Sequence, residues 1–572
     1  MKIHRLGILL AILFAFALYG AASAQSPNPN GNGQGNQGRG QGAENSARVS
    51  LQILAINDFH GNIDTLSTVN GVPAGGAEYL ATNFRTLEAQ NPNTVIVSAG
   101  DLIGASPLIS ALFHDEPTIE AAGLFGLDIN AVGNHEFDDG AAELLRMQYG
   151  GCHPVDGCQD GDPFGGAQFQ FLAANVLDNA SGATLFPAFK VMEFQGVRVA
   201  FIGLTLEGTP TIVTPTGVAG LTFRDEADTI NALVAELRRA NIESIVVLIH
   251  EGGVQVGSGI GPNTCVGISG PIVDIVNRTD PAVDLFITGH THQNYNCRIG
   301  GRPVTSTNAF GRFFTKIDIE LNRVTKDMTV LAVDNRLNDR AVGAAPDLTT
   351  LVTKYRTLVA PLANRVIGSI TADILRAANA AGESALGDVI ADSQLAATAP
   401  AALGGAVIAF MNPGGIRADL TFAQVSGGEA PGKVTYGEAF TVQPFGNSLV
   451  TLDLTGAQID TLLEQQFNNP SPGQNRILQV SNGFSYAWSA SAPAGSRVDP
   501  ASIMLNGVPL NPAAVYRVTV NSFLADGGDN FTVLIQGTNR VGGAQDLDAL
   551  SAYFAANVPV APGPMNRITR LP

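Results

Sequence analysis

Side chains that bind metal ions gather in five short clusters of the sequence between residues 57 and 292. Seven of them offer a carboxylate, an amide oxygen or an imidazole: Asp58, His60, Asp101, Asn134, His250, His290 and His292. Such ligands favour Zn, Mn, Mg or Co over soft metals. Seven ligands are too many for one ion that keeps positions open for a substrate. They suit two divalent ions roughly 3.5–4 Å apart with one bridging carboxylate.

The alternative is that these histidines are structural, because a single histidine at a strand end is commonly a hydrogen-bonded structural residue. We expect that role for His114 and His153, which lie outside the five clusters. Five of the eight histidines, however, stand in the clusters beside a carboxylate, an asparagine or another histidine. This coincidence favours a functional site.

The elements that must position these residues are short apolar runs, each ending at one of the clusters. The runs cover residues 51–56, 94–98, 129–132, 244–249 and 283–288. Their length and β-branched residues predict strands buried on both faces. Segments between them, such as 225–240, have apolar residues at helical spacing. The alternation predicts an α/β layered domain whose ligands bind beyond the carboxyl ends of the strands.

Two of the clusters place ligands at alternate positions, as Asp58-x-His60 and His290-x-His292. On an extended backbone, alternate side chains point in the same direction. An extended backbone at these two clusters would therefore bring the members of each pair together.

Composition and charge limit the class of protein. The chain has 572 residues, of which 45% are hydrophobic and 14% are charged. This is enough apolar material for two or more domains. The composition excludes a wholly disordered chain, a coiled coil and collagen. The formal net charge is −18, and it becomes −20 without the first 24 residues, which carry Lys2 and Arg5 and no acid. So acidic a surface disfavours a nucleic acid polymer as partner, while a small phosphorylated ligand could still bind where cations are concentrated.

The N-terminus predicts export. Residues 1–24 have the basic start, the apolar stretch (residues 6–18) and the small-residue Ala22-Ser23-Ala24 site of a signal peptide. The alternative is an uncleaved anchor, but the apolar stretch is shorter than the roughly 20 residues that span a bilayer. We expect a periplasmic or extracellular protein with no stable membrane anchor. Residues 25–47 are rich in Gly, Asn and Gln and are expected to be a flexible linker.

Four cysteines in an exported chain predict disulfides, for which three pairings are possible. We favour Cys152–Cys158 and Cys265–Cys297. A zinc site made of all four thiolates is the competing interpretation, but only one close pair is present and there is no C-x-x-C.

A second domain is expected beyond residues 343–365, which we interpret as a connecting helix broken at Pro361. In the Gly/Ala-rich remainder (366–572), a Gly-Gly turn beside Arg417 could bind an anion. Phe445 and Phe523 could sandwich a planar ring, although single loop phenylalanines are commonly core residues. Asp529 could accept hydrogen bonds from sugar hydroxyls.

The motifs NDFHG, GD, GNHEFD, the strand-end His250 and GHTH, in this order, resemble the 5′-nucleotidase branch of the calcineurin-like metallophosphoesterases. That branch includes the periplasmic 5′-nucleotidase/UDP-sugar hydrolases and the ecto-5′-nucleotidases. The C-terminal loops are similar to the same family, so that the resemblance covers residues from about 48 to 560. It implies a metallophosphoesterase α/β sandwich at 48–342 and an α+β substrate-binding domain at 366–572.

The resemblance also implies roles for single residues. One metal ion would be bound by Asp58, His60, Asp101 and His292, and the other by Asp101, Asn134, His250 and His290, with Asp101 bridging. His135 would face the substrate phosphate, and Asp138 would orient and polarise it. Apart from the resemblance, we expect Glu136 to be either a bystander or a residue that helps to hold the loop. Phe445 and Phe523 would stack on the base, Asn412 would meet the base, Asp529 the ribose and Arg417 the phosphate.

One feature departs from the family pattern. The family usually supplies further arginines from the helix that precedes the segment 382–387. At the expected spacing this chain has Ala380, and Arg376 lies one turn earlier. The contacts that would distinguish mono-, di- and triphosphates are therefore not predicted.

The function implied is an exported, metal-dependent 5′-nucleotidase in which a hydroxide activated by two metal ions attacks the 5′-phosphate of a nucleotide. His135 would stabilise the developing charge or protonate the departing oxygen. Alternatives on the same scaffold are a 2′,3′-cyclic phosphodiesterase/3′-nucleotidase, a UDP-sugar hydrolase or another pyrophosphatase, and Asp138 in GNHEFD favours the 5′ branch. A non-catalytic nucleotide-binding surface protein would be marked by loss of a ligand, yet every expected ligand position is filled.

Overall fold

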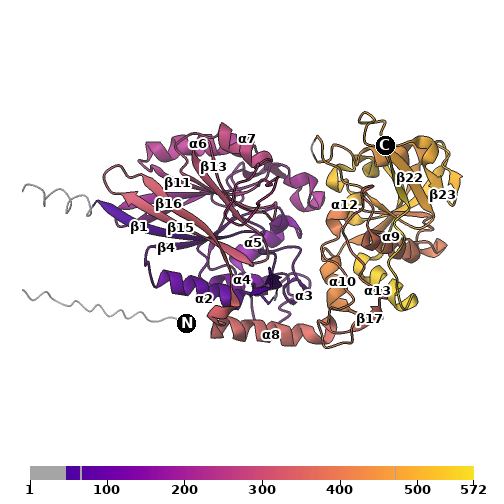
Figure 1. Ribbon diagram of the computed structural model, residues 1–572, viewed down its shortest axis with the longest axis horizontal. Coiled ribbons are helices and arrows are strands. Elements are labelled where there is room, and N and C mark those ends of the chain that lie inside the picture. The colour runs from indigo at the N-terminus through magenta and orange to yellow at the C-terminus, as the bar shows by residue number, and fades with distance from the viewer. Residues whose placement is uncertain (1–46, 65–66, 471) are drawn as a thin grey trace, which may run out of the picture. The chain divides into compact units, whose positions relative to one another are not determined.

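Two six-stranded sheets pack face to face in the N-terminal part of the protein (Figure 1). Their strand orders are β16-β15-β1-β4-β5-β6 and β13-β14-β12-β11-β9-β8. The first comprises β1 (Arg48–Ile56), β4 (Thr94–Ser98), β5 (Ile129–Ala131), β6 (Gln170–Leu172), β15 (Phe313–Asn322) and β16 (Met328–Leu337). The second comprises β8 (Phe189–Phe194), β9 (Val197–Thr205), β11 (Ser244–His250), β12 (Leu285–Thr288), β13 (Asn294–Ile299) and β14 (Arg302–Thr307).

This computed structural model describes residues 47–64, 67–470 and 472–572. The predicted signal peptide (1–24), and the predicted linker (25–47) except for its last residue, lie outside the described residues. Among the helices that are described, none has the length and apolar character needed to span a membrane.

Four neighbouring strands of each sheet are parallel. In the first sheet β1, β4, β5 and β6 run the same way, as do β9, β11, β12 and β14 in the second. Apolar side chains of both sheets, among them Ile53, Val97 and Leu248, fill the space between them. All five predicted strands are present, with His250 as the last residue of β11.

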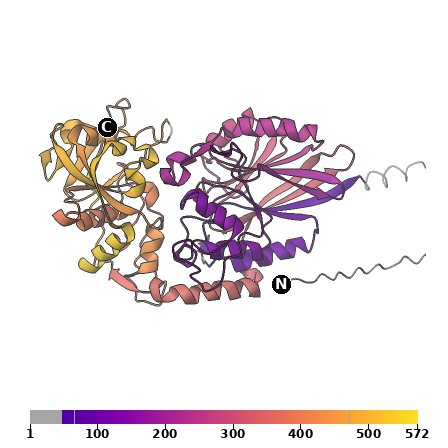
Figure 2. The ribbon, with the colours of Figure 1, turned by 180° about the vertical axis from the view of Figure 1, so that it is seen from behind.

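Helices cover the two outer faces (Figure 1 and Figure 2). On the first sheet lie α2 (Ala77–Glu88), α4 (Glu116–Leu124) and α5 (Ala141–Tyr149), and on the second lie α6 (Glu226–Arg239) and α7 (Pro271–Arg278). The expected helix at 225–240 is confirmed as α6. Its N-cap, Asp225, accepts a hydrogen bond from the Asp228 N–H, and Ile230, Val234 and Leu237 are buried. The four layers are the predicted α/β sandwich.

The expected connector is helix α8 (Pro346–Ala363), which also packs against α2, α3 (Leu108–Ala111) and α4. The prediction that this helix breaks at Pro361 is wrong, because Pro361 lies inside it. A proline removes one intrahelical hydrogen bond, but only two residues of the helix follow this one, so the cost stays local. The exact limits of the two domains stay a prediction.

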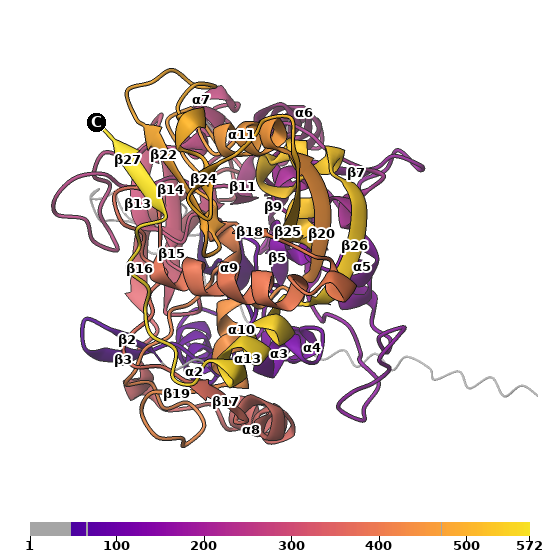
Figure 3. The same ribbon diagram turned by 90° about the vertical axis from the view of Figure 1, so that its right-hand side faces the viewer.

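The C-terminal part contains a five-stranded sheet of order β21-β18-β25-β20-β26. Helix α9 (Ala385–Thr398) packs across one face and contacts α13 (Asp546–Ala556), while α11 (Gly456–Glu464) covers the other (Figure 3). The strands are β18 (Ile408–Met411), β20 (Ser448–Thr455), β21 (Gln479–Val480), β25 (Val515–Asn521) and β26 (Thr538–Gln545). Its mixed strand directions agree with the predicted α+β domain.

The cysteines pair as the sequence analysis favours. Cys152 is joined to Cys158 and Cys265 to Cys297, with Cα–Cα distances of 4.8 and 5.0 Å. The first pair closes a short loop after α5, and the second ties β13 to the segment that follows β11.

Candidate active site

The seven predicted ligands all lie at the carboxyl ends of parallel strands, as expected. They come from both sheets. His250 is the last residue of β11, and the others follow their strands within a few residues: Asp58 and His60 (β1), Asp101 (β4), Asn134 (β5), His290 and His292 (β12). Because the two sheets face each other, strand ends that are far apart in the sequence meet at one edge of the sandwich.

The backbone at the candidate ligands is not extended. The expectation that alternate side chains point in the same direction therefore does not apply to Asp58-x-His60 and His290-x-His292. Five ligands have a positive φ: 50° at Asp58, 47° at His60, 49° at Asp101, 70° at His290 and 53° at His292. Hydrogen bonds between the loops hold this conformation, since the Asp58 N–H donates to the Gly100 carbonyl and the His60 N–H to that of Asp101. Left-handed residues other than glycine cost about 1–3 kcal/mol each and gather at functional sites.

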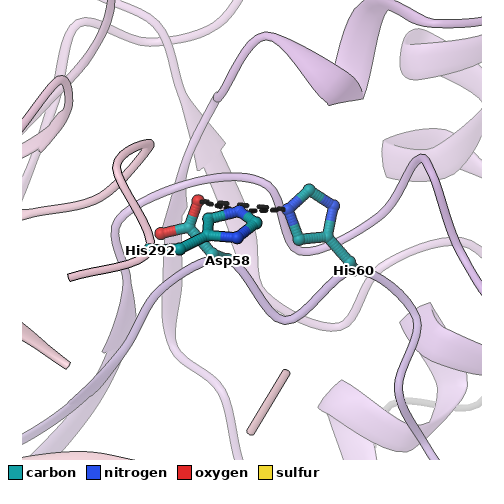
Figure 4. Close-up of side chains that lie close together, drawn as sticks. All are labelled: Asp58, His60 and His292. Carbon is teal, nitrogen blue, oxygen red and sulfur yellow. Dashed lines mark hydrogen bonds and ion pairs between the residues drawn. The ribbon is translucent and has the colours of Figure 1, made fainter. Parts of the chain in front are cut away.

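Asp58, His60 and His292 form one cluster (Figure 4). The two Nε2 atoms of the histidines are 3.1 Å apart, and the His292 Nε2 lies 3.4 Å from Oδ1 of Asp58. Nδ1 of His60 donates to the Gly104 carbonyl, which leaves a lone pair on its Nε2. Burial holds the pKa of His60 well below its usual value, so this imidazole is neutral, the form that binds a metal ion.

Asp101, His250 and His290 form the second cluster. Nδ1 of His250 donates to the Ala99 carbonyl, and its Nε2 lies 2.9 Å from Oδ2 of Asp101 without the alignment of a hydrogen bond. Nδ1 of His290 is 3.0 Å from Oδ1 of Asn134. Burial, then the charge of His250, lowers the pKa of His290 to about 4.

The residues present fit a pair of divalent ions. Asp101 lies between the two clusters, because its Oδ2 is also 3.7 Å from Nε2 of His60. Nε2 of His250 is buried without a hydrogen-bond partner, and the lone pair on Nε2 of His60 faces Nε2 of His292 at 3.1 Å. With neutral rings, a cation between the clusters could accept these nitrogen lone pairs. The donor atoms are the imidazoles and carboxylates that zinc and manganese accept.

His135 is held for a role beside the clusters. Its Nδ1 donates to Oδ2 of Asp138 at 2.8 Å, and its ring stacks on Phe445 with the centroids 5.8 Å apart. Its ligand atom also comes within reach of His60 and Asp101. Burial opposes the charged imidazole, but Asp138 and Asp101 outweigh it and raise the pKa of His135.

Glu136 holds the loops that carry two ligands. It is 3% exposed, and its carboxylate accepts from the backbone N–H groups of Asp101, Leu102 and Gly133. The Nδ2 of Asn130 donates to it as well. Burial, then the charge of Asp101, raises its pKa to about 7, while these donors favour the carboxylate. Of the two roles considered for Glu136, bystander or holder of the loop, the four hydrogen bonds agree with the second.

One pocket is lined both by the predicted substrate-binding residues and by residues at the two clusters of candidate ligands. Its lining includes Asn412, Arg417, Phe445, Phe523 and Asp529, together with Asn134, His135, Asp138 and His290. Both phenylalanines are partly exposed, and Phe523 also packs against the hydrophobic core of the C-terminal part, so its core role and its place in the pocket are both present. The guanidinium of Arg417 lies 5.7 Å from the ring centroid of Phe445.

Asp529 is the centre of a hydrogen-bond network in this pocket. Its Oδ1 accepts from Arg476 at 2.7 Å and its Oδ2 from the Asn412 Nδ2 at 2.8 Å. Oδ1 of Asn412 in turn accepts from the Nδ2 of Asn521. Burial raises the pKa of Asp529, and Arg476 opposes this shift. The network fixes a carboxylate at the pocket wall.

Sequence reasoning missed several residues of this pocket. They are Ile212, Val213, Thr214, Asn447, Arg476 and Asn521, whereas Gly414 and Gly415 belong to the Gly-Gly turn that the sequence already pointed to. Arg476 stands next to an apolar run that becomes β21, and this position was its only sequence signal. The polar residues at the end of β25 and after Phe445 offered a similar signal for Asn521 and Asn447.

The helix expected before residues 382–387 is absent from the described residues 366–384. There β17 (Val366–Ser369) is followed by a loop, and α9 begins only at Ala385, after its N-cap Ser384. Arg376 therefore lies on a loop, where it faces the Ile416 carbonyl rather than the pocket of Arg417.

Two family models match the chain. The model for calcineurin-like phosphoesterase covers residues 51–294, and that for the 5′-nucleotidase C-terminal domain covers residues 366–536. A solved structure described as a 5′-nucleotidase precursor from Thermus thermophilus has 27% sequence identity and a TM-score of 0.72, and the match covers 91% of this chain and 99% of that chain.

Two curated relatives are longer than this chain. Endonuclease YhcR of Bacillus subtilis (strain 168) is 32% identical, over 88% of this chain and 39% of the relative. Cell wall protein Lmo0130 of Listeria monocytogenes is 34% identical, over 85% of this chain and 64% of the relative. The chain thus spans less than two thirds of either relative. The two family matches, the two-sheet fold and the ligand clusters agree, and the chain belongs to the 5′-nucleotidase family of calcineurin-like phosphoesterases, which are metal-dependent hydrolases.

Proposed function

We propose that the protein is an exported 5′-nucleotidase, which hydrolyses the 5′-phosphate ester of a nucleotide to the nucleoside and phosphate. One observation carries this proposal. A single pocket is lined by Asn134 and His135 at the metal clusters and by Phe445 and Phe523 from the C-terminal part. Its lining thus combines groups that can bind a phosphate with rings that can stack on a planar base.

We assign Asp58, His60, Asp101 and His292 to one divalent ion, and Asp101, Asn134, His250 and His290 to the other. The location of Asp101 between the clusters supports its role as the shared ligand. Ions bound there would lower the pKa of a bound water and neutralise phosphate oxygens. Zn, Mn, Mg and Co all suit this donor set.

His135, oriented by Asp138, would donate a proton to the departing oxygen. The reaction forms a bond from a water oxygen to phosphorus and breaks the bond from phosphorus to the 5′ oxygen of the nucleoside, which then needs a proton. Asp138 accepts from Nδ1 of His135, so Nε2 of the same ring is available to face the substrate. A neighbouring carboxylate favours the charged imidazole, which can donate from Nε2.

The remaining pocket residues would bind the nucleotide. Phe445 and Phe523 would stack on the base and Asn412 would contact its edge. Asp529, held in place by Arg476 and Asn412, would accept from a ribose hydroxyl. Arg417 would pair with the phosphate, since its guanidinium lines the same pocket as His135.

The direct test measures nucleoside and phosphate release from AMP with Mn²⁺ or Zn²⁺ present, alongside 3′-AMP, 2′,3′-cyclic AMP, UDP-glucose and a single-stranded oligonucleotide. We expect AMP to be the preferred substrate. The oligonucleotide tests for endonuclease activity, which the name of the relative YhcR states for that protein. Because this chain is strongly acidic, we expect the oligonucleotide to remain intact. A preference for a cyclic nucleotide or for UDP-glucose would replace the proposal with one of the two related activities.

The mechanism has its own test. His135→Ala should lower kcat for AMP by about 10²–10⁴-fold, the usual contribution of a general acid. Val324→Ala, which changes a side chain that is 78% exposed and lines no part of the pocket, is the control. Wild-type kcat in His135→Ala would disprove the role of His135.

Export is part of the proposal. The predicted signal peptide supports it, as does the name of the relative Lmo0130, a cell wall protein. Fractionation of cells that express the full chain should place the activity outside the cytoplasm, and recovery of an uncleaved chain in the cytoplasm would contradict it.

A further inference from the structure

Phe310 packs against two of the candidate ligands, although no motif of the sequence singled it out. Its ring centroid is 5.7 Å from that of His60 and 5.3 Å from that of His292, and the ring planes meet at 53° and 78°. The two imidazoles are 5.1 Å apart, with their Nε2 atoms facing each other at 3.1 Å. The three rings therefore form one cluster, in the tilted and edge-to-face contacts that aromatic rings prefer.

The backbone at Phe310 is strained. Its φ is 63°, in the left-handed region that a bulky side chain rarely adopts. Such a conformation costs about 1–3 kcal/mol and persists only where the surrounding contacts fix it. Here the Phe310 N–H donates to the Asp58 carbonyl at 2.7 Å. The residue that packs against two candidate ligands is therefore hydrogen-bonded to the backbone of a third.

The loop of Phe310 is fastened to both segments that carry these ligands. Asn57, which ends the segment of β1, accepts from the Thr307 N–H and donates to the Asn308 carbonyl. The Asn308 N–H donates to the carbonyl of Gln293, which follows the GHTH motif. These hydrogen bonds fix the place of Phe310 relative to the loops that follow β1 and β12.

Two neighbours in the sequence hold the ring of Phe310 in place. The guanidinium of Arg312 lies over it, 4.9 Å from the centroid, and Nε of Arg312 donates to the Ala309 carbonyl. Gly311 has a φ of 62°, and a Cβ there would lie 2.7 Å from the buried ring of Phe59. Only glycine fits this close approach, so the loop has little freedom to move the ring.

We propose that Phe310 is a positioning residue, which keeps the imidazoles of His60 and His292 turned toward one divalent ion. A phenyl ring packs against imidazoles without offering an atom that competes for their lone pairs. Phe310 does not line the substrate pocket, so it acts through the two histidines. Loss of a contact that orients a metal ligand costs roughly 10- to 100-fold in metal affinity. This inference rests on the ion assignment of the proposed function and deepens it.

The test titrates Mn²⁺ into the ion-free full chain and follows the bound ions by electron paramagnetic resonance. Wild type should bind two equivalents. Phe310→Leu keeps apolar bulk but removes the ring, so one equivalent should bind roughly 10- to 100-fold more weakly and the other should be retained. Phe310→Tyr keeps the ring and should restore the affinity. If Phe310→Leu binds both equivalents as tightly as wild type, the proposal is overturned.

The same substitution elsewhere is the matched control. Phe422 is 41% exposed and belongs to neither ligand cluster, so Phe422→Leu should bind both equivalents as wild type does. Excess Mn²⁺ should restore the AMP turnover of Phe310→Leu, because the loss lies in ion binding. A loss of turnover that excess Mn²⁺ does not restore, with unchanged ion affinity, would show that the ring only packs the fold.

Ion-free crystals give a readout that needs neither metal nor activity. In wild type the Nε2 atoms of His60 and His292 should stay 3.1 Å apart, and in Phe310→Leu at least one of these rings should turn away. Unchanged orientation of both rings in Phe310→Leu would contradict the role of Phe310. Absence of bound Mn²⁺ in wild type would instead contradict the ion assignment, and the comparison of the rings would still decide the role of Phe310.

Discussion

Replacement of Glu136 by glutamine tests how the ligand loops are held. In the wild-type protein Oε1 accepts from the Leu102 N–H and from Asn130, and Oε2 accepts from the N–H groups of Asp101 and Gly133. Glutamine has the same shape but one oxygen. Whichever way its amide is turned, two buried N–H donors face an NH₂ group and lose their acceptor.

The expected cost follows from these contacts. A buried donor left without a partner costs about 1–3 kcal/mol, so two of them should lower the free energy of unfolding by about 2–6 kcal/mol. In either orientation one of the two lost donors, the N–H of Asp101 or that of Leu102, lies on the loop of the proposed shared ligand Asp101, and displacement of a catalytic group by about 1 Å can cost about 10²-fold. We expect kcat for AMP to fall roughly tenfold to a hundredfold.

Urea unfolding and AMP turnover measure the two effects. Glu251→Gln is the matched control, because Glu251 is also buried but accepts from one backbone N–H only, that of Gly252. Its amide can turn an oxygen to this single donor, so the loss should stay below about 1 kcal/mol. The reasoning fails if Glu136→Gln unfolds at the same urea concentration as Glu251→Gln and keeps the wild-type kcat.

Three further predictions concern the base, the ribose and pH. Phe445→Ala and Phe523→Ala should each raise the KM for AMP roughly 5- to 150-fold, which corresponds to about 1–3 kcal/mol of stacking, and leave the KM for ribose 5-phosphate unchanged. An equal effect on both substrates would exclude stacking. Arg476→Met leaves the buried carboxylate of Asp529 unpaired and should raise the KM for AMP about tenfold, with partial rescue in Arg476→Lys. Burial raises the pKa of Asp284 to about 8, so the folded protein holds a proton that the unfolded chain releases at lower pH. Stability should therefore fall as pH rises from about 4 to about 8, by at most about 1.4 kcal/mol per pH unit from this group, and Asp284→Asn should flatten the fall in urea unfolding.

The strands and the gathering of the candidate ligands at one edge could be predicted because both follow from local sequence patterns. The apolar run before Asp58 and the one before Asp101 each indicate a buried strand, and a parallel sheet places the residues that follow such strands at one edge. Residue type then selected the candidate ligands, whose binding of metal ions stays a prediction. The left-handed backbone at His60 and His292 could not be predicted, because it depends on hydrogen bonds between loops rather than on the residues themselves.

Contacts between distant segments account for what the sequence analysis missed. Arg476 carries no motif, and its role depends on Asp529, which is 53 residues away. The same holds for His114 and His153, which looked isolated in the sequence but stack because the disulfide loop folds back beside α4. Pro361 was expected to break α8, whereas its location near the helix end makes the loss of one hydrogen bond tolerable.

The most direct test of the two-ion site is a crystal structure of the full chain with Mn²⁺, with anomalous data collected to locate the metal. We predict two neighbouring peaks in the active site, with a carboxylate oxygen of Asp101 in contact with both. His60 and His292 should contact one peak, and His250 and His290 the other. A single peak there, or two peaks that Asp101 does not join, would contradict the assignment.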